Sequence, residues 1–195
     1  MGVEIEVKFR ATNEQLDKVF QDYPGHWRTI SMESTYYDTP DGALSQKHYT
    51  LRHRKENDES ICTLKAPVQG FGRGEYETAC DDIYEAVPVL CKLSGLEQML
   101  LPLRRQLVCV CGAKFTRLAK TLTFPDCTVE LALDRGVLTG GGRSADLCEL
   151  EAELKSGSQE AMLRFARTLF TQYGLVLEKQ SKFRRALQLA RPKGE

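Results

Sequence analysis

The stretch Val3-Glu4-Ile5-Glu6-Val7-Lys8-Phe9 alternates strictly between apolar and charged residues. Successive side chains of a β-strand point to opposite faces, so this stretch predicts a strand with two carboxylates and one ammonium group on a single face. A strand of this kind is ordinary in an antiparallel sheet that has one face in water. Its meaning therefore depends on whether the pattern recurs along the chain.

Five later stretches repeat the alternation, and their charged faces carry both signs. They are Leu51-Arg52-His53-Arg54, Cys62-Thr63-Leu64-Lys65, Gly74-Glu75-Tyr76-Glu77, Thr128 to Asp134, and Leu147 to Leu154. Each of them alone is typical of a solvated strand face. Together they predict a closed or strongly curved sheet whose charged faces look inward at one another, while the apolar faces point outward and are covered by helices.

The composition is that of an ordinary globular protein, with 195 residues, 42% hydrophobic and 28% charged, and no net charge. We expect one domain over residues 1–195, and the zero net charge argues against a nucleic-acid partner. The seven cysteines contain no Cys-x-x-Cys pair, and the three histidines show no zinc-site spacing. Because there is no signal peptide and no apolar run of about 18 residues, we expect reduced thiols, a cytoplasmic location and no membrane partner.

Helical patterns are fewer than strand patterns. We expect helices over residues 12–20, over 81–103 with breaks at Pro88 and Pro102, over about 158–173, and over about 181–189. Gly140-Gly141-Gly142 predicts a mobile loop, and no linker divides the chain. We therefore predict an α+β fold, an eight-stranded antiparallel closed β-barrel (a tunnel) with a charged lumen, flanked by a few α-helices.

Three residues beside these strands have a less direct interpretation. We expect His53 to point outward and to pack half-buried. Arg73 lies in a glycine-rich stretch, where solvated surface is favoured over a contact with substrate at the tunnel mouth. Lys120 fits either face, because a bulge between Lys114 and Phe124 would reverse the alternation.

A dry interior cannot hold this many charges, because burying an unpaired ion is very costly, so the lumen must be wet and must contain counter-charges. Its basic side chains suit a polyanion, with the arginines suited to bidentate phosphate contacts: Lys8, Arg52, Arg54, Lys65 and Arg117. Its carboxylates suit a divalent metal, and oxygen ligands favour Mg²⁺ or Mn²⁺: Glu4, Glu6, Glu130, Asp134, Glu149 and Glu151. A metal between carboxylates and phosphates is the arrangement that phosphoryl transfer needs.

Glu4-Ile5-Glu6-Val7-Lys8 resembles the Glu-x-Glu-x-Lys signature of the CYTH superfamily, the triphosphate tunnel metalloenzymes. Further matches follow in family order and span essentially the whole chain: Tyr36-Tyr37-Asp38-Thr39-Pro40-Asp41, Leu51-Arg52-His53-Arg54, Thr63-Leu64-Lys65, Glu75-x-Glu77, Glu130-x-x-x-Asp134-x-Gly136 and Glu149-x-Glu151. Ser181-Lys182-Phe183 is similar to the family's closing Ser-Lys-aromatic motif. The chain departs from the family pattern at His53, where an aliphatic residue is usual.

The resemblance implies a tunnel that binds a triphosphate together with two Mg²⁺ or Mn²⁺ ions. It implies phosphate binding by Lys8, Arg52, Arg54, Lys65, Arg117 and Lys182. Metal binding would fall to Glu4, Glu6, Glu149 and Glu151, with support from Glu130 and Asp134, while Glu75 and Glu77 would orient basic side chains or position water. The catalytic set would be Glu4, Glu6, Lys8, Glu149, Glu151 and Lys182.

The match at 36–40 resembles the hydrolytic branch of the family. We therefore predict an inorganic triphosphatase, a monomer or homodimer that cleaves tripolyphosphate to pyrophosphate and phosphate. One alternative is a class IV-type adenylate cyclase, and another is a thiamine triphosphatase, which needs a stacking site that the sequence does not reveal. A non-catalytic polyphosphate- or nucleotide-binding module is disfavoured, because both charge sets are complete.

Overall fold

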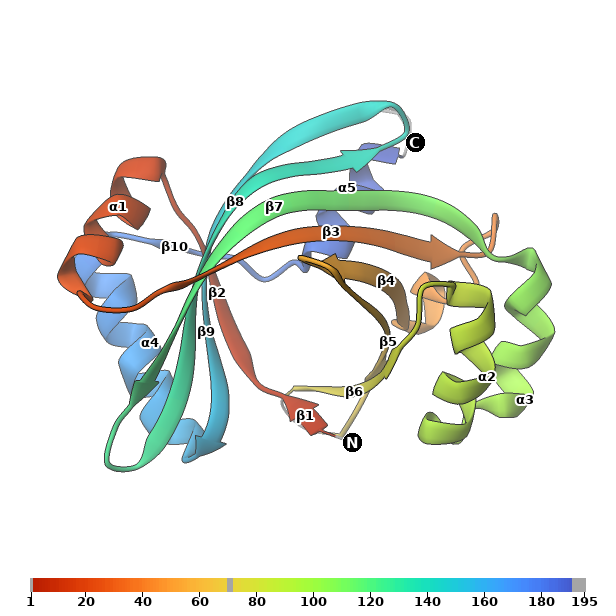
Figure 1. Ribbon diagram of the computed structural model, residues 1–195, viewed down its shortest axis with the longest axis horizontal. Helices are drawn as coiled ribbons and strands as arrows, with labels where there is room; N and C mark the ends of the chain where they lie inside the picture. The colour runs from red at the N-terminus through yellow and green to blue at the C-terminus, as the bar shows by residue number, and fades with distance from the viewer. Residues whose placement is uncertain (1, 70–71, 191–195) are drawn as a thin grey trace.

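An antiparallel sheet of ten strands is the centre of the computed structural model, which describes residues 2–69 and 72–190. The sheet is strongly curved, and its long strands β3, β7 and β8 arch over the rest (Figure 1). In order across the sheet, the strands are β1 (Gly2–Glu4), β6 (Arg73–Ala79), β5 (Glu59–Pro67), β4 (Thr50–Glu56), β3 (Arg28–Asp38), β7 (Val108–Thr123), β8 (Cys127–Gly140), β9 (Arg143–Gly157), β2 (Glu6–Arg10) and β10 (Val176–Leu177).

The prediction of a closed barrel of eight strands is wrong in two respects. The first predicted strand is interrupted at Ile5, so β1 pairs with β6 while β2 pairs with β9. Residues 4–6 thus join the two sides of the sheet through the chain, and within the described residues no ladder of hydrogen bonds closes the sheet. The two-residue strand β10 adds a pairing beside β2, which gives ten strands, or nine if β1 and β2 count as one interrupted strand.

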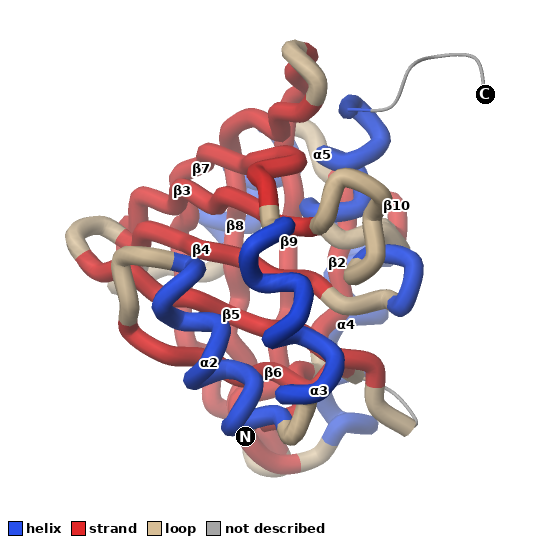
Figure 2. Tube along the Cα trace, turned by 90° about the vertical axis from the view of Figure 1, so that its right-hand side faces the viewer, coloured by secondary structure: helices blue, strands red, loops and turns tan. Residues whose placement is uncertain are grey.

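Helices cover the outer face of the sheet at two places, as Figures 1 and 2 show. α1 (Asn13–Asp22) and α4 (Gln159–Tyr173) pack on β2, β8 and β9, where Met162 and Leu169 of α4 are fully buried against Leu131. α2 (Ile83–Ser94), α3 (Glu97–Leu100) and the 3₁₀ helix η2 (Leu101–Gln106) cover β4 and β5. Burial of apolar strand faces under these helices leaves the charged faces for the inside of the curve.

Two local expectations about loops and helix ends fail. Pro88 lies inside α2 rather than breaking it, because its neighbours Val87 and Leu90 are buried in the core and outweigh one lost hydrogen bond. The helix instead ends at Gly95, which has a φ of 70°. Gly140-Gly141-Gly142 is part of a tight hairpin, since Gly140 pairs with Arg143 across it.

The last helix, α5 (Lys182–Ala190), lies inside the curve under β7 and β8 (Figure 1). Ser181, at which the helix was expected to begin, caps it by accepting a hydrogen bond from the backbone N–H of Arg184 at 3.2 Å. Phe183 packs on the inner face of the sheet, with its ring centroid 5.2 Å from that of Tyr36. α5 therefore fills one part of the interior and presents its N-terminus to the rest.

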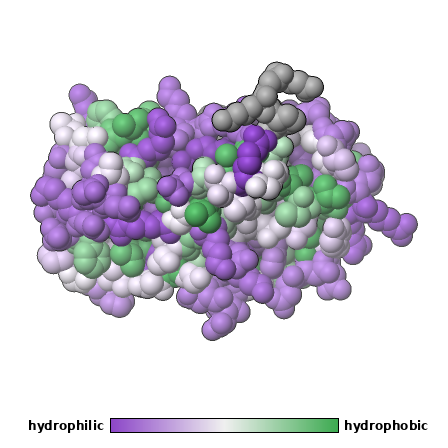
Figure 3. Space-filling view, turned by 90° about the horizontal axis from the view of Figure 1, so that it is seen from above, coloured by the Kyte–Doolittle hydropathy of each residue, from purple (hydrophilic) through white to green (hydrophobic). Residues whose placement is uncertain are grey.

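A short 3₁₀ helix, η1 (Ser45–Lys47), lies between β3 and β4. Seen from above, the molecular surface is mostly hydrophilic, with small separate apolar groups (Figure 3). Within residues 2–69 and 72–190, no helix has the length and hydrophobicity required to span a membrane.

Candidate active site

The inner face of the sheet and the start of α5 enclose a cavity of about 650 Å³. Among the described residues that line it, nine are cationic and eight are carboxylates. The cations are Lys8, Arg28, Arg52, Arg54, Lys65, Arg73, Arg117, Lys155 and Lys182, and the acids are Glu4, Glu6, Glu56, Glu75, Glu77, Glu130, Glu151 and Glu153. This cavity collects the charged strand faces in one place.

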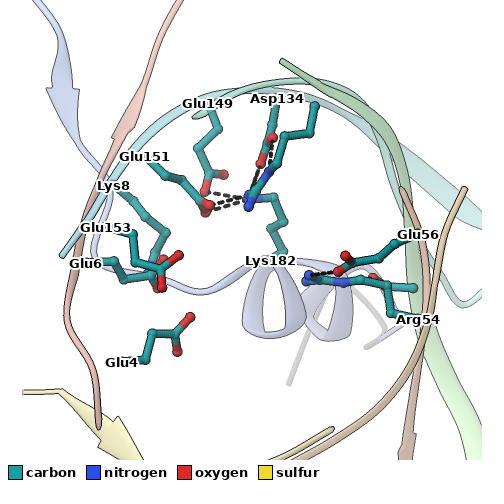
Figure 4. A network of polar contacts seen from close by, with 12 residues as sticks. Glu4, Glu6, Lys8, Arg54, Glu56, Asp134, Glu149, Glu151, Glu153 and Lys182 are labelled. Carbon is teal, nitrogen blue, oxygen red and sulfur yellow. Dashed lines mark hydrogen bonds and ion pairs between the residues drawn. The ribbon is translucent and has the colours of Figure 1, made fainter. Parts of the chain in front are cut away.

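The two signs are unevenly distributed around the cavity, although Glu75 and Glu77 of β6 lie beside the cations of β5. Arginines and a lysine predominate on β4 and β5, whereas carboxylates predominate on β1, β2, β8 and β9. In Figure 4 the carboxylates of Glu4, Glu6 and Glu153 lie together on one side, and Arg54 with Glu56 lies on the other. A wall of cations facing a wall of carboxylates suits a ligand that combines a polyanion with metal cations.

Arg52 is the most deeply buried cation of the β4 wall, with 6% of its surface exposed. Its Nη2 donates to Thr63 Oγ1 at 2.9 Å, and the nearest carboxylate oxygens, of Glu77 and Glu75, are 3.7 and 3.8 Å away. Its buried Nε has no hydrogen-bond partner. Burial, and secondarily the charge of Arg54, lowers the pKa of Arg52. This guanidinium has donor capacity to spare for an anion in the cavity.

The other cations of this region are paired with carboxylates. Arg54 donates to Glu56 at 3.1 Å and to Ser34 Oγ at 3.2 Å. Lys65 contacts the carboxylate of Glu4 and lies 3.2 Å from Glu75. Lys65 therefore joins the cationic wall to the acidic one.

A buried network surrounds the ammonium group of Lys182 at the start of α5 (Figure 4). Lys182 Nζ lies 2.8 Å from Asp134, 3.0 Å from Glu149 and 2.6 Å from Glu151. Arg117 binds Asp134 through two nitrogens, at 2.8 and 2.7 Å, and also contacts Glu151. Burial acts to raise the pKa of Glu151, but Lys182 and Arg117 overcome it and hold that pKa well below its usual range. Glu151 is therefore ionised at neutral pH.

The acidic wall contains a row of three carboxylates of like charge. Glu6 is directly opposite Glu153 in the β2–β9 register, and Glu153 is directly opposite Glu130 in the β8–β9 register. The pKa of Glu153 is raised, chiefly by burial. In the described part of the chain, no three acidic, histidine or cysteine side chains are gathered as a preformed metal site. The carboxylate oxygens of Glu6, Glu130 and Glu153 nevertheless fit a hard divalent cation, and a bound cation would relieve the repulsion between these side chains.

Each carboxylate of this row has a cationic neighbour. Glu6 accepts from Lys8 at 2.6 Å, and Glu153 from Lys155 at 3.0 Å. Glu130 accepts from Arg28 at 2.7 Å. Burial acts to lower the pKa of Lys8, but Glu6 and Glu151 together raise it. The lysines and Arg28 thus balance the acidic wall when no other cation is present.

Most residues predicted for the site lie on the cavity wall, namely Glu4, Glu6, Lys8, Arg52, Arg54, Lys65, Glu75, Glu77, Arg117, Glu130, Glu151 and Lys182. Asp134 and Glu149, predicted as metal ligands, do not line the cavity and are fully buried. They share the inward face of their strands, but α5 covers that part of the face and Lys182 stands between them and the cavity.

The structure adds lining residues that the sequence interpretation left out of the site: Arg28, Glu56, Arg73, Glu153 and Lys155. Glu153 belongs to the alternating stretch Leu147 to Leu154, although it was not assigned to the site, and alternation continued beyond Arg54 and Leu154 would have found Glu56 and Lys155. The expectation of solvated surface for Arg73 is wrong, since this arginine donates to the carbonyl of His48 at 2.6 Å on the cavity wall. His53 is half-buried outside the cavity, as predicted, and Lys120 lies on the outer face, donating to the carbonyl of Pro24 at 2.8 Å.

The comparison with known proteins agrees with this architecture. The chain belongs to the CYTH domain family, whose model matches residues 2–187. The inorganic triphosphatase of Haemophilus influenzae is 29% identical over 166 residues, which are 83% of this chain and 47% of that protein. The chain thus spans about half the length of this curated relative.

Two solved structures show the same fold. A proposed adenylate cyclase from Bacillus halodurans has a TM-score of 0.68 and 18% identity, covering 94% of this chain and 96% of its own. HpAC1 from Hippeastrum, proposed as an adenylyl cyclase and described as having a dominant triphosphatase activity, has a TM-score of 0.63 and 19% identity, covering 96% and 95%.

Proposed function

We propose that this chain is a divalent-metal-dependent triphosphatase that hydrolyses inorganic tripolyphosphate to pyrophosphate and phosphate in its cavity. The observation that carries this proposal is one cavity in which cations predominate on β4 and β5 and carboxylates predominate on β1, β2, β8 and β9. Since nine lining cations and eight lining carboxylates nearly cancel, a highly charged polyanion is best accommodated together with metal cations. The 29% identity to an inorganic triphosphatase of Haemophilus influenzae supports the same class of reaction.

The cationic wall is the proposed phosphate site. Arg52 has an unpartnered buried donor, and Arg54 and Lys65 stand beside it on the same wall. Arginine forks suit the paired oxygens of phosphoryl groups. Lys8, Arg117 and Lys182 lie nearer to the carboxylates and would contact the end of the triphosphate that is next to the metal.

The acidic wall is the proposed metal site, and its oxygen donors fit Mg²⁺ or Mn²⁺. We assign metal binding to Glu4, Glu6, Glu130, Glu151 and Glu153. Asp134 and Glu149, which do not reach the cavity, would instead hold Lys182 and Arg117 in position. Two bound ions would supply neutralisation of the developing charge and a more acidic water.

The proposed reaction consumes one water molecule. The water oxygen forms a bond to a terminal phosphorus while the bond from that phosphorus to the bridging oxygen breaks. Pyrophosphate leaves with the electron pair, and one proton of the water is released. The lining lysines and arginines would stabilise the charge that develops on the phosphoryl oxygens.

The apolar part of the cavity wall favours an inorganic substrate over a nucleotide or thiamine triphosphate. The apolar lining residues are Ile30, Met32, Tyr36 and Phe183. Met32, Tyr36 and Phe183 are only 2%, 4% and 7% exposed, and the two rings pack on each other. Neither the Tyr36 ring nor the Phe183 ring presents a free face on which a base could stack.

The test is release of phosphate and pyrophosphate from tripolyphosphate, ATP and thiamine triphosphate, each with Mg²⁺ and with Mn²⁺. A double variant, Glu4→Gln with Glu6→Gln, prepared in parallel, controls for contaminating phosphatases. Preferred turnover of tripolyphosphate that the double variant lacks would support the proposal. Pyrophosphate released from ATP without phosphate would favour a cyclase, faster turnover of thiamine triphosphate would favour that substrate, and no turnover would favour a binding module.

A further inference from the structure

Arg185 contacts the buried network of Lys182 from the side away from the cavity. It lies on α5, does not line the cavity, and its Nη2 contacts Glu149 Oε2, while the other oxygen, Glu149 Oε1, accepts from Lys182 at 3.0 Å. Glu149 is fully buried, so its carboxylate bridges two cations with no water between them. Lys182 on one side of this bridge faces the cavity, and Arg185 on the other side does not.

Arg185 also forms an ion pair with Glu178, in addition to its contact with Glu149. Its Nη1 lies 3.6 Å from Glu178 Oε2, which is also 3.5 Å from Arg10 Nε. The backbone N–H of Glu178 donates to the carbonyl of Lys8 at 2.8 Å, and the other oxygen of Glu178 accepts from the backbone of Gln180. Arg185 is therefore held between the segment that precedes α5 and the carboxylate that holds Lys182.

The charges of this network balance only when Arg185 is counted. Its three carboxylates are Asp134, Glu149 and Glu151, and its three cations are Arg117, Lys182 and Arg185. With all three carboxylates ionised, the network without Arg185 carries one excess negative charge beside the cavity. Both oxygens of Glu149 would then be available to Lys182 and would draw its ammonium group back from the cavity.

We propose that Arg185 is a positioning residue: by occupying Glu149 Oε2, it keeps the ammonium group of Lys182 directed toward the cavity and available to a phosphate anion. This inference rests on the proposed binding of a triphosphate. It goes further in assigning a role to a residue that touches neither the cavity nor the reacting atoms. Arg185 acts on substrate affinity through Glu149 and Lys182.

The test measures the Kd of tripolyphosphate by calorimetry at pH 8.5 with EDTA, so that neither metal nor hydrolysis contributes. Arg185→Gln is expected to raise Kd about tenfold, the size expected for one uncompensated charge several ångströms from a polyanion. Arg185→Lys, which keeps the charge, is expected to restore most of the affinity. The matched control is Arg184→Gln, because Arg184 is the neighbouring arginine of α5, is exposed and does not line the cavity.

A double variant separates positioning from a general effect on folding. Arg185→Gln combined with Glu149→Gln removes one charge of each sign and is expected to bind tripolyphosphate more tightly than Arg185→Gln alone. A merely structural role would instead lower the melting temperature further in the double variant and give no recovery of Kd. With magnesium, the single variant is expected to raise KM more than it lowers kcat.

The outcomes distinguish this inference from the function on which it rests. A wild-type protein that binds tripolyphosphate, with an unchanged Kd in Arg185→Gln, would overturn the positioning role and leave the proposed function intact. An equal loss of affinity in Arg184→Gln would also overturn it, because the effect would then be general to charge on α5. A wild-type protein that neither binds tripolyphosphate in EDTA nor hydrolyses it with Mg²⁺ would overturn both. If it binds only with metal, an unchanged KM in Arg185→Gln would overturn the positioning role alone.

Discussion

Glu6 of β2 and Glu153 of β9 are directly opposed in the antiparallel register, and both line the cavity. Opposed side chains of a sheet are close neighbours, so two ionised carboxylates in this arrangement repel each other. Glu153 has a second such neighbour in Glu130 on its other side. Lysine and arginine side chains partly balance this row, and the proposed metal would balance it further.

The first prediction concerns Glu153→Gln. Removing the middle charge is expected to raise the free energy of unfolding in EDTA by about 0.5 kcal/mol, because burial and nearby carboxylates raise the pKa of Glu153 in spite of its ion pair with Lys155. With Mg²⁺ it is expected to lower kcat tenfold or more, because a metal ligand is lost. Chemical denaturation and steady-state kinetics check the two parts. Glu33→Gln is the control, since Glu33 lies outside the cavity and its side chain is 57% exposed; a destabilised Glu153→Gln would contradict the interpretation.

Glu4→Gln is expected to act in opposite directions on binding and on turnover. The change removes the carboxylate that contacts Lys65, which frees that lysine for phosphate. Metal-free binding of tripolyphosphate should therefore tighten several-fold, while hydrolysis with saturating Mg²⁺ falls by a larger factor. Calorimetry and phosphate release measure the two effects. Full activity of the variant with Mg²⁺ would show that Glu4 does not hold the metal.

Binding of tripolyphosphate is predicted to need both the charge of Arg52 and the paired N–H donors of its guanidinium group. Arg52→Lys is expected to raise the Kd of tripolyphosphate about tenfold and Arg52→Gln about a hundredfold, because lysine cannot make paired contacts with a phosphoryl group. The rise in melting temperature on adding tripolyphosphate should shrink in the same order. Arg135→Gln is the control, because Arg135 also forms an ion pair, with Asp17, but does not line the cavity. Equal binding of tripolyphosphate by wild type and Arg52→Lys would show that Arg52 contributes only its positive charge.

The burial of the His53 side chain predicts a pH dependence of folding stability that does not involve the cavity. Its Nε2 is buried without a hydrogen-bond partner, and burial, with Lys55, lowers its pKa below 6.5. The unfolded chain therefore binds a proton at a higher pH than the folded one, so stability falls as the pH drops below about 6.5. His53→Gln is expected to reduce the difference in unfolding free energy between pH 7.5 and pH 5.5. An unchanged difference, with His26→Gln as the comparison, would assign the pH effect to other groups.

Much of the strand and helix arrangement could be predicted from short-range patterns. Alternation placed Glu4, Arg52 and Glu151 on a common inner face, and helical patterns placed the starts of α4 and α5 to within one residue. The alternating stretch Leu147 to Leu154 also contains Glu153, which lines the cavity. Periodicity depends only on the geometry of a few neighbouring residues, which is why it can be read from the chain alone.

The sequence by itself determined which side chains face inward, because alternation in a strand is a local property. Only the tertiary structure decided which of them reach the cavity. α5 covers the inward face at Asp134 and Glu149 and leaves Glu153 open, and the break at Ile5 sends β1 and β2 to different neighbours. These outcomes depend on contacts between segments that are far apart in the sequence, such as that of Lys8 with Glu151 in the register of β2 and β9, and no local pattern encodes them.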